Sequence, residues 1–502
     1  MIGRLAMRDG AVYAALAAYF AINVLVRLAG PDSLELDEGQ QLFFAQWLAP
    51  GYDSQPPFYN WLQYGVVQLL GSNMLAISLL KNLMLFLSYL FFGLTAHIII
   101  RDRVLAVIAT LGLITFPQVG YEAQRDLTHT VAVLFSACLF GYVFVRTLET
   151  PTAVNYALVG AAVGFGVLSK YNFALLPLVA ALAVLPDPQL RRRLFDARML
   201  IAIAVAFVIV LPHALWFLGH FDAATSRTLE KLTDGGDVSR AGQIASGVAS
   251  LVGAFAAFVL PTALVFLIAF GMALPRAWRA ETQWTRLIGR MFAIALGLLL
   301  LVVILGASDI KDRWLVPIFL LLPIYLAAKL DASGQPLGSA PARFGAVVAA
   351  IMVVVPLALF MRPYLAGWTA HYGKQNVPYG QATAEILASG QHRPSVILTL
   401  DHQLAGNLRL HAPDIAVAVP GYAHGVPFAF DATHPVLAVW RRRDGGATLN
   451  PSEEMWRWLN QNDALAGRPL EAKDAAFPYH YGRDGDVYHF GYAWIYPAAQ
   501  GG

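Results

Sequence analysis

The sequence contains little charge. Only 13% of its 502 residues are Asp, Glu, Lys or Arg, against roughly 25% in an ordinary soluble domain. Hydrophobic residues make up 57% of the chain, and the mean hydropathy is +0.55. A soluble protein this apolar has too few polar side chains to cover its surface, so the composition predicts an integral membrane protein. The formal net charge of +3 is too small to indicate a nucleic acid as partner.

Other absences narrow the chemistry. The single cysteine, Cys138, lies in an apolar run, which excludes an intrachain disulfide. There is no P-loop and no Gly-rich dinucleotide fingerprint, so no nucleotide site is indicated. We find no internal repeat, a feature of many secondary transporters. We expect no required cofactor; the sequence is compatible with a divalent cation but gives no support for one.

Apolar runs long enough to cross a hydrocarbon core of about 30 Å recur along most of the chain. Lys and Arg concentrate in alternate connections, as at Arg101, Arg103 and Arg191–Arg193, whereas residues 30–73 contain neither. The positive-inside rule then places the N-terminus in the cytoplasm and the 30–73 loop outside. We predict about eleven spans, near residues 11–29, 74–98, 104–118, 127–145, 154–168, 173–185, 199–217, 245–273, 291–306, 314–328 and 344–361.

The character of the chain changes after Arg362. The following residues are rich in His, Asp, Gly, Pro and aromatics, and they alternate short strand-like and helix-like patterns. An odd number of spans puts this part on the same side as the 30–73 loop. We therefore predict a transmembrane module over 1–362 and a small α/β domain over 363–502, with strands near 395–400 and 435–440 and helices near 379–389 and 452–460.

The first outer loop carries an acidic pair, Asp37-Glu38. The pattern over 34–48 predicts an amphipathic helix capped by Asp37, and Pro56-Pro57 predict the start of a second helix. Spacing alone favours a structural role for the acids, as an N-cap and a first-turn acid stabilised by the helix dipole. The alternative is a carboxylate held at the membrane surface that serves as general base.

Five loose motifs, in this order and at the ends of the predicted spans, give the chain a family resemblance. It resembles a bacterial polyprenyl-phosphate-sugar-dependent glycosyltransferase of C type, a group that contains protein O-mannosyltransferases, lipid A aminoarabinose transferases and galacturonic acid transferases of rhizobial lipopolysaccharide. The resemblance covers roughly residues 10 to 330. The motifs are Asp37-Glu38, the run from Gln55 to Leu62, Arg125-Asp126, Leu168 to Tyr171 continuing to Pro177, and Lys311 to Pro317.

The resemblance implies an inverting enzyme of the bacterial inner membrane that works at the periplasmic face. Asp37 would be the catalytic carboxylate, with Glu38 beside it. Relatives have a lysine where this chain has Gln55, so a positive charge thought to approach the donor phosphate is missing. The implied partners are a polyprenyl-phosphate-sugar donor, a lipid or glycan acceptor and membrane lipids; we expect no nucleic acid partner and a monomeric protein.

Transfer from such a donor leaves negative charge on the departing phosphate, which calls for cations near the outer headgroups. Lys170, in a turn between two short spans, matches a family lysine and is our first choice. We add four further cations and four residues of the substrate pocket. For the cations and Asp126, snorkelling to lipid headgroups or a structural ion pair is the alternative, and for His213 an interfacial position beside an aromatic residue. The cations are Arg125, Lys311, Arg313 and Lys81, and the pocket residues are Gln55, Tyr59, Asp126 and His213.

The leading hypothesis is therefore a glycosyltransferase that modifies an envelope acceptor, with lipid A or lipopolysaccharide core as the favoured choice. Within the enzyme class, protein O-glycosylation is the alternative. A secondary transporter or lipid flippase with a periplasmic domain is the alternative from another class. Ionisable residues that cluster at one membrane face favour surface chemistry over transport.

Overall fold

The computed structural model describes residues 9–221, 239–422, 429–431, 433–442, 449, 451, 453–461, 465–467 and 470–497. The chain divides into two compact units, which we describe separately. Unit 1 comprises Met1–Ile22, Ala49–Tyr59 and Lys81–Val355, and unit 2 comprises Asn23–Leu48, Asn60–Leu80 and Pro356–Gly502. The predicted boundary at residue 362 placed the whole first loop in the transmembrane module, whereas most of this loop belongs to unit 2.

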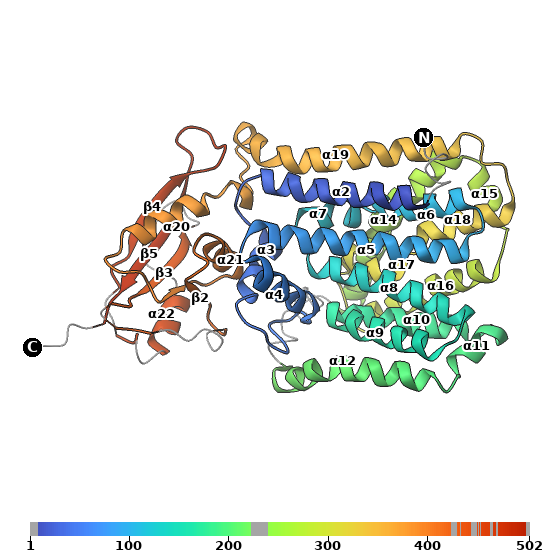
Figure 1. Cartoon of the computed structure of the whole chain (residues 1–502), viewed down its shortest axis with the longest axis horizontal. Coiled ribbons are helices and arrows are strands. Elements are labelled where there is room, and N and C mark those ends of the chain that lie inside the picture. Colours follow the sequence, from blue (N-terminus) through green and yellow to red (C-terminus); the bar gives the residue numbers. More distant parts are fainter. Residues whose placement is uncertain are drawn as a thin grey trace, which may run out of the picture. The chain divides into compact units, whose positions relative to one another are not determined.

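Helices make up unit 1, and in Figure 1 they run alongside one another. Long helices continue from one unit into the other at both ends of the chain. The helices that begin or end in unit 1 are α2 (Asp9–Ala29), α4 (Phe58–Leu70), α5 (Met74–Ile99), α6 (Arg103–Leu111), α7 (Ala123–Arg125), α8 (His129–Glu149), α9 (Ala153–Ser169), α10 (Leu175–Val184), α11 (Pro188–Leu194), α12 (Met199–Gly219), α14 (Arg240–Phe270), α15 (Ala273–Ala277), α16 (Gln283–Ile304), α17 (Val316–Phe319), α18 (Leu322–Ser333) and α19 (Ala340–Thr369).

Within the described residues, eight helical segments are long and apolar enough to cross a membrane. They are α2, α5, α8, α12, α14, α16, the pair α17–α18 and α19. Two shorter apolar helices, over 153–169 and 171–184, lie where the fifth and sixth spans were predicted. The protein is thus a multi-pass membrane protein, and the count of eleven stays a prediction.

The third predicted span, 104–118, is not one continuous helix. After α6 the backbone tightens to a 3₁₀ turn, η1 (Gly112–Thr115), and then widens to a π turn, η2 (Gln118–Glu122). The two halves are bent by 69°. Pro117 stands at the break, where its ring removes a backbone N–H that a straight helix would need. Two more 3₁₀ turns, η3 (Tyr171–Ala174) and η4 (Asp312–Trp314), precede α10 and α17.

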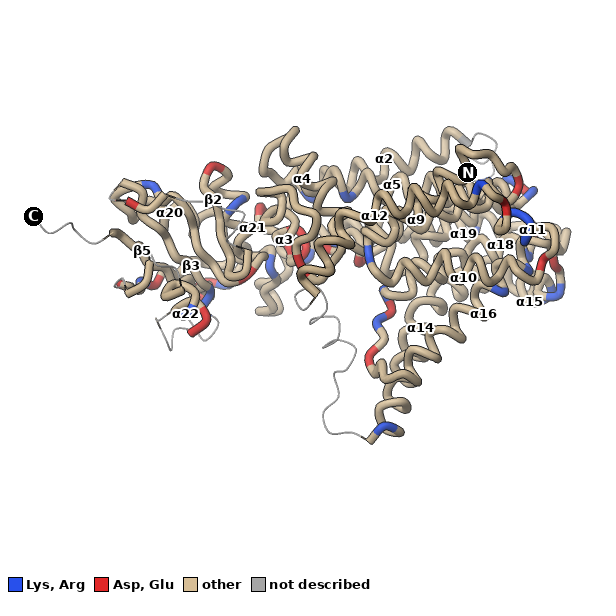
Figure 2. The backbone as a smooth tube through the Cα atoms, turned by 90° about the horizontal axis from the view of Figure 1, so that it is seen from below, with Lys and Arg blue, Asp and Glu red and all other residues tan. Residues whose placement is uncertain are grey.

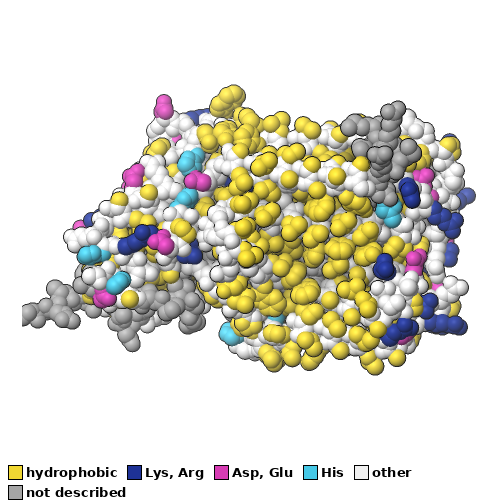
Figure 3. Space-filling view, in the orientation of Figure 1, with side chains coloured by type: hydrophobic (Ala, Val, Ile, Leu, Met, Phe, Trp, Pro, Cys, Tyr) yellow, Lys and Arg dark blue, Asp and Glu magenta, His cyan; other side chains and the backbone are white. Residues whose placement is uncertain are grey.

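Side-chain types in unit 1 follow the demands of a bilayer. Large apolar residues such as Leu200, Phe207 and Leu264 are more than half exposed, and Figure 3 shows hydrophobic side chains covering the visible face of these helices. Lys and Arg gather at one end of the unit, around α11 and α15 (Figure 2). We call this the arginine-rich end; the breaks η2, η3 and η4 lie at or toward the other ends of their helices.

Unit 2 contains α3 (Leu36–Phe44) and a mixed sheet of five strands in the order β2-β1-β3-β5-β4. β1 is parallel to β2 and β3, whereas β5 is antiparallel to β3 and β4. The remaining elements are η5 (Lys374–Asn376), α20 (Tyr379–Ala388), β1 (Val396–Leu398), α21 (His402–His411), β2 (Ala416–Ala418), β3 (Val436–Arg442), α22 (Glu453–Gln461), β4 (Lys473–Pro478) and β5 (Val487–Ile495). The α/β class and the four predicted elements of this domain are confirmed.

The sheet buries both faces. On one face, Val396, Val436 and Trp440 pack with Met455 and Leu459 of α22. The other face receives α20 and α21, as the Tyr379–Phe490 ring contact shows. α3 packs on α21, and at the crossing the two helices approach so closely that only glycine fits on either side. A Cβ on Gly406 would lie 2.0 Å from the backbone oxygen of Gly39.

Candidate active site

In unit 2, the predicted catalytic loop forms the start of α3. The N-cap of this helix is Glu35, so the prediction that Asp37 caps it is wrong. Glu35 is buried and pairs with Arg362 of α19, with Nη2 and Oε1 2.9 Å apart. The carboxylate thereby gains both a cation and the positive end of the helix dipole.

Glu38, in the first turn of α3, is paired with Arg27 of α2. Its side chain is fully buried, and its Oε2 lies 2.8 Å from Nη2 of Arg27, while its Oε1 lies 3.2 Å from Nε. Oε2 also accepts from the backbone N–H of Glu35 at 3.1 Å. Arg27, near the end of α2, is therefore the partly buried partner of Glu38. A catalytic role for Glu38 stays a prediction, and these contacts give it a structural task.

Asp37 stands between these two anchored acids, in the first turn of α3. Its side chain is half-buried, whereas those of Glu35 and Glu38 are enclosed. The two ion pairs fix the backbone on either side of Asp37. Asp37 thus lies on an anchored helix start with its side chain half-buried, and its catalytic role stays a prediction.

In unit 1, polar contacts join the breaks of several helices. Asn172 of η3 donates to the backbone oxygen of Trp314 at 2.9 Å, and Gln118 of η2 donates to the carboxylate of Asp312 in η4. Three irregular segments, from the third, sixth and tenth predicted spans, are thereby tied together. Irregular backbone in a membrane protein is tolerated where protein groups or water satisfy it, which marks this region as the polar part of unit 1.

Two of the predicted cations lie at these junctions. Lys170 follows the last residue of α9 and is half-buried, and its Nζ donates to the hydroxyl of Thr130 at 3.2 Å. The Thr130 hydroxyl thereby orients the ammonium. Lys81 is almost completely buried in α5, and its Nζ donates to the backbone oxygen of Gln124 at 3.1 Å.

The remaining cations lie nearer the surface. Arg125 is 3.1 Å from the carboxylate of Glu122, and Lys311 is 2.5 Å from that of Asp309. These carboxylates offset part of the positive charge that a donor phosphate would meet. Arg313 is exposed on η4, and Asp126 is half-exposed just after α7.

His213, one of the predicted pocket residues, contacts the loop before α4. His213 Nδ1 lies 2.8 Å from the backbone oxygen of Pro50, and its Nε2 lies 3.0 Å from the Tyr171 hydroxyl. Because a carbonyl oxygen only accepts, Nδ1 carries the proton and the Nε2 of the neutral ring accepts from tyrosine. Tyr59 is fully buried 6.2 Å from the ring of His129, and Gln55 is half-buried. His213 therefore connects the loop to the residue that follows Lys170.

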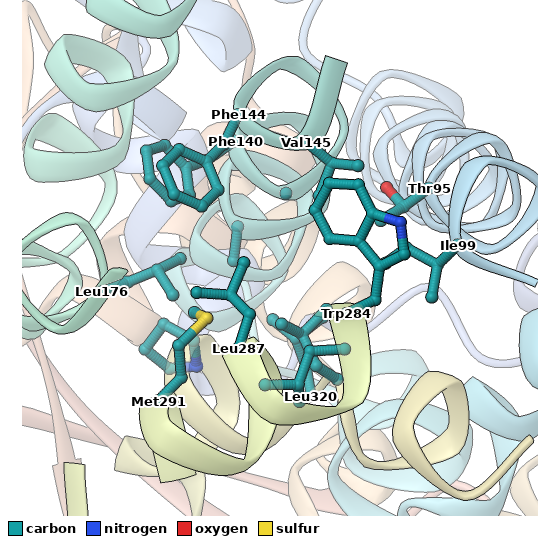
Figure 4. A pocket seen from close by; sticks show the side chains of 15 residues that line it. Thr95, Ile99, Phe140, Phe144, Val145, Leu176, Trp284, Leu287, Met291 and Leu320 are labelled. Atoms are coloured by element: carbon teal, nitrogen blue, oxygen red, sulfur yellow. The ribbon is translucent and has the colours of Figure 1, made fainter. Parts of the chain in front are cut away.

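An apolar pocket opens inside unit 1 (Figure 4). It contains about 440 Å³ of space not occupied by atoms, part of which is open to the surroundings. At one limit lie Ile99, the last residue of α5, and Trp284, near the start of α16; at the other lie Leu176 and Pro317, which come just after η3 and η4. The pocket thus extends from the arginine-rich end of unit 1 toward η3 and η4, where the predicted cations Lys170, Lys311 and Arg313 lie.

No group of three or more His, Cys, Asp or Glu residues able to hold a metal ion occurs within the described part of the chain. The absence of a required cofactor stays a prediction. Sequence reasoning missed the uncharged partners Thr130, Asn172 and Gln118. Their signal was present, since each is a polar residue next to a break in an apolar run.

Comparison with known proteins identifies the family. The chain is 48% identical over 485 residues to the lipopolysaccharide core galacturonosyltransferase RgtB of Rhizobium johnstonii, covering 96% of this chain and 97% of that protein. It is 43% identical over 484 residues to the lipopolysaccharide core galacturonosyltransferase RgtA of the same organism, covering 96% of each. The chain belongs to this galacturonosyltransferase family. It is therefore a glycosyltransferase, which decides between the enzyme and the transporter that the sequence left open.

Two further comparisons agree with this family. Residues 54–216 match the family model described as dolichyl-phosphate-mannose-protein mannosyltransferase, and this segment holds Gln55, Lys170 and His213. The fold is that of ArnT from Cupriavidus metallidurans, solved bound to undecaprenyl phosphate, with a TM-score of 0.58, 13% identity and coverage of 95% of this chain and 97% of that one. The galacturonosyltransferase family thus shares the C-type membrane fold expected from the motifs.

Proposed function

We propose that this chain transfers a galacturonosyl residue from a polyprenyl-phosphate-linked donor to the core of lipopolysaccharide, at the periplasmic face of the bacterial inner membrane. Similarity to RgtB over nearly the whole of both chains carries the proposal. The undecaprenyl phosphate bound to ArnT, which has the same fold, supports a lipid-linked donor. The crowding of Lys and Arg at one end of unit 1 supports a cytoplasmic position for that end.

On the acceptor side, Asp37 is the proposed base. The acceptor hydroxyl attacks the anomeric carbon of the donor sugar as its proton passes to the Asp37 carboxylate. The bond between that carbon and the phosphate oxygen breaks, and its electron pair stays on the phosphate. The products are a glycoside of inverted configuration and free polyprenyl phosphate.

On the donor side, Lys170 is the proposed phosphate contact. Its ammonium is half-buried next to a helix break and donates to the hydroxyl of Thr130. A fixed cation stabilises the charge that grows on the phosphate as the sugar leaves. Gln55 provides no such charge, so we assign the larger share of this task to Lys170.

The apolar pocket of unit 1 is the proposed site of the donor's hydrocarbon chain. Its lining is almost entirely apolar, with Thr95 as the exception. Because the pocket begins just past η3 and η4, a phosphate held at Lys170 would leave the chain directed into it. A hydrocarbon chain bound there gains affinity through close packing against the walls of the pocket.

Mass spectrometry of lipopolysaccharide tests the proposed function. Core oligosaccharide from cells that express the chain should carry one more hexuronate than core from cells that lack it, and the Asp37→Asn variant should match the cells that lack it. A hexose or aminopentose increment would contradict the assigned sugar. An increment on lipid A with an unchanged core would contradict the assigned acceptor.

A further inference from the structure

The sheet of unit 2 contains a topological switch point. β1 pairs in parallel with β2 on one side and with β3 on the other. The chain leaves β1 through α21 to reach β2, and it later returns to β3 across β1. In open sheets of this kind, ligands bind in the crevice outside the carboxyl ends of two adjacent parallel strands whose connections lead to opposite sides of the sheet order. Here those ends carry Thr399, Asp401 and Arg441.

Arg441 is a buried cation with unused donors. Its side chain is 6% exposed and lies on the face of β3 that receives α20. Nη2 is 3.2 Å from Oδ1 of Asp401, but neither Nε nor Nη2 makes a hydrogen bond of acceptable geometry to any described residue. The Nε–Nη2 edge of a guanidinium is the fork that a carboxylate fits with two parallel hydrogen bonds. Burying these donors without acceptors is costly, which points to an occupant.

The end of β1 supplies further polar groups. Asp401 caps α21 by accepting from the backbone N–H of Leu404 at 2.7 Å, and its side chain is 39% exposed. Thr399 is fully buried, and its Oγ1 has no hydrogen-bond partner within the described residues. A ligand that satisfies all these groups needs a carboxylate for Arg441 and hydroxyls for Asp401 and Thr399. A phosphate would bring a larger negative charge against Asp401 and would offer it no hydroxyl.

Aromatic rings line the start of α21. The ring of His402 stacks on Phe43 with centroids 5.2 Å apart and meets Tyr422 at 4.8 Å. His402 and Tyr422 are half-buried, whereas Phe43 is enclosed. Half-open rings beside a few fixed polar groups are typical of sites for small polar ligands with an apolar face, as a sugar ring has.

We propose that the carboxyl ends of β1 and β3 form an acceptor subsite that binds a sugar acid of the glycan. Arg441 takes the carboxylate, Asp401 and Thr399 take ring hydroxyls, and His402 and Tyr422 contact the sugar face. This inference rests on the proposed function and assigns a task to the terminal domain. Phe43 and Phe44 end α3, whose first turn contains Asp37, about 10 Å away along the helix axis. The subsite therefore recognises a residue of the acceptor close to the one that is glycosylated.

A double variant tests the subsite without leaving a buried charge unpaired. Arg441→Met/Asp401→Asn removes both members of the pair, a change that buried ion pairs tolerate better than the loss of one partner. The matched control is Arg393→Met/Asp414→Asn, which removes an exposed ion pair from the same unit. Thr399→Val is a third, nearly isosteric variant. Thermal unfolding in detergent shows which proteins are folded.

Kinetics with two acceptors separate recognition from folding. The acceptors are the acidic core oligosaccharide and the same oligosaccharide with its carboxyl groups reduced to alcohols. For the unmodified enzyme, reduction should raise the acceptor KM roughly 10- to 100-fold, the value of a charged hydrogen-bonded contact. In the Arg441→Met/Asp401→Asn variant both acceptors should show the raised KM, while kcat and donor KM stay near normal; the exposed-pair control should behave like the unmodified enzyme.

Equilibrium binding of the two oligosaccharides, followed by intrinsic fluorescence, gives a readout that needs no turnover. Loss of the preference for the acidic oligosaccharide in the double variant, and weaker binding by Thr399→Val, support the subsite. An unchanged preference in a folded double variant overturns it, as does full binding by Thr399→Val if the double variant fails to fold. An unmodified enzyme that binds the acidic oligosaccharide but transfers no sugar to it contradicts the proposed function and leaves the subsite standing.

Discussion

Replacing Lys170 by methionine removes the ammonium group and keeps most of the length and packing of the side chain. The structure supplies the basis for a magnitude. The ammonium is half-buried and is oriented by the Thr130 hydroxyl at 3.2 Å. A unit charge about 4 Å from a phosphate contributes roughly 4 kcal/mol at an effective dielectric constant near 20.

Only the part of that interaction that grows as the glycosidic bond breaks affects the chemical step. Loss of one such fixed contact lowers rates by about 100- to 1,000-fold, or roughly 2.7–4 kcal/mol. We therefore expect Lys170→Met to lower kcat by this factor with a smaller change in the donor KM, because the contact strengthens in the transition state. Thr130→Val, which removes the orienting hydroxyl, should lower kcat about tenfold.

The assay is transfer from a polyprenyl-phosphate-linked donor by enzyme reconstituted in lipid nanodiscs. Lys473→Met, which removes an exposed lysine of β4, is the matched control and should leave both constants unchanged. Gln55→Lys should be tolerated and should restore part of the activity of Lys170→Met. An unchanged kcat and donor KM in Lys170→Met would refute the phosphate assignment and shift it to Lys81 or Arg125.

Three further substitutions test separate parts of the account. Arg27→Met leaves Glu38 buried without its cation and should destabilise the protein by about 3–5 kcal/mol in a detergent unfolding titration. The double variant Arg27→Met/Glu38→Gln should recover much of this stability. Equal stability of the single and double variants would contradict the ion pair. Gly141→Leu fills the apolar pocket and should raise the donor KM about tenfold. The control Gly297→Leu should leave the donor KM unchanged, because Gly297 is exposed and has no neighbouring atom within 4 Å of its Cβ position. Equal effects of the two substitutions would argue against the pocket as the lipid site. Burial lowers the pKa of His411 below its ordinary value of 6.5. Between these two pKa values the unfolded chain binds more protons than the native protein. The melting temperature should therefore fall as the pH drops from about 6.5 toward the lowered pKa. His411→Gln should flatten this fall, and a pH-independent melting temperature of the unmodified protein over that window would count against the assignment.

Hydropathy and charge were enough to predict most of the fold. A bilayer requires long apolar helices, so the composition of a segment such as 199–217 is close to decisive. The broken segment at 104–118 shows the limit of that reasoning. Its hydropathy is that of a span, but Pro117 and the polar partners of the neighbouring breaks determine its path.

The candidate site was predictable only where the signal is local. The acidic pair and the turn at Lys170 can be read from the sequence, and the family resemblance indicates the missing lysine at Gln55. The pairing of Arg27 with Glu38 cannot be predicted from the sequence. It joins α2 to α3, and each residue could equally well have had a role without the other. The same holds for the terminal domain, since the crossing of Gly39 with the helix that carries Gly406 depends on the tertiary fold.

Transfer by the reconstituted enzyme is the decisive measurement for the proposed reaction. Purified enzyme in nanodiscs would receive lipopolysaccharide core and galacturonate linked to polyprenyl phosphate, and both products would be quantified by mass spectrometry. We expect one polyprenyl phosphate to be released for each hexuronate gained by the core. In folded Asp37→Asn, kcat should fall by about 100- to 10,000-fold, the range for a positioned general base. Transfer from a nucleotide sugar in place of the lipid-linked donor, or normal turnover by Asp37→Asn, would contradict the proposed reaction.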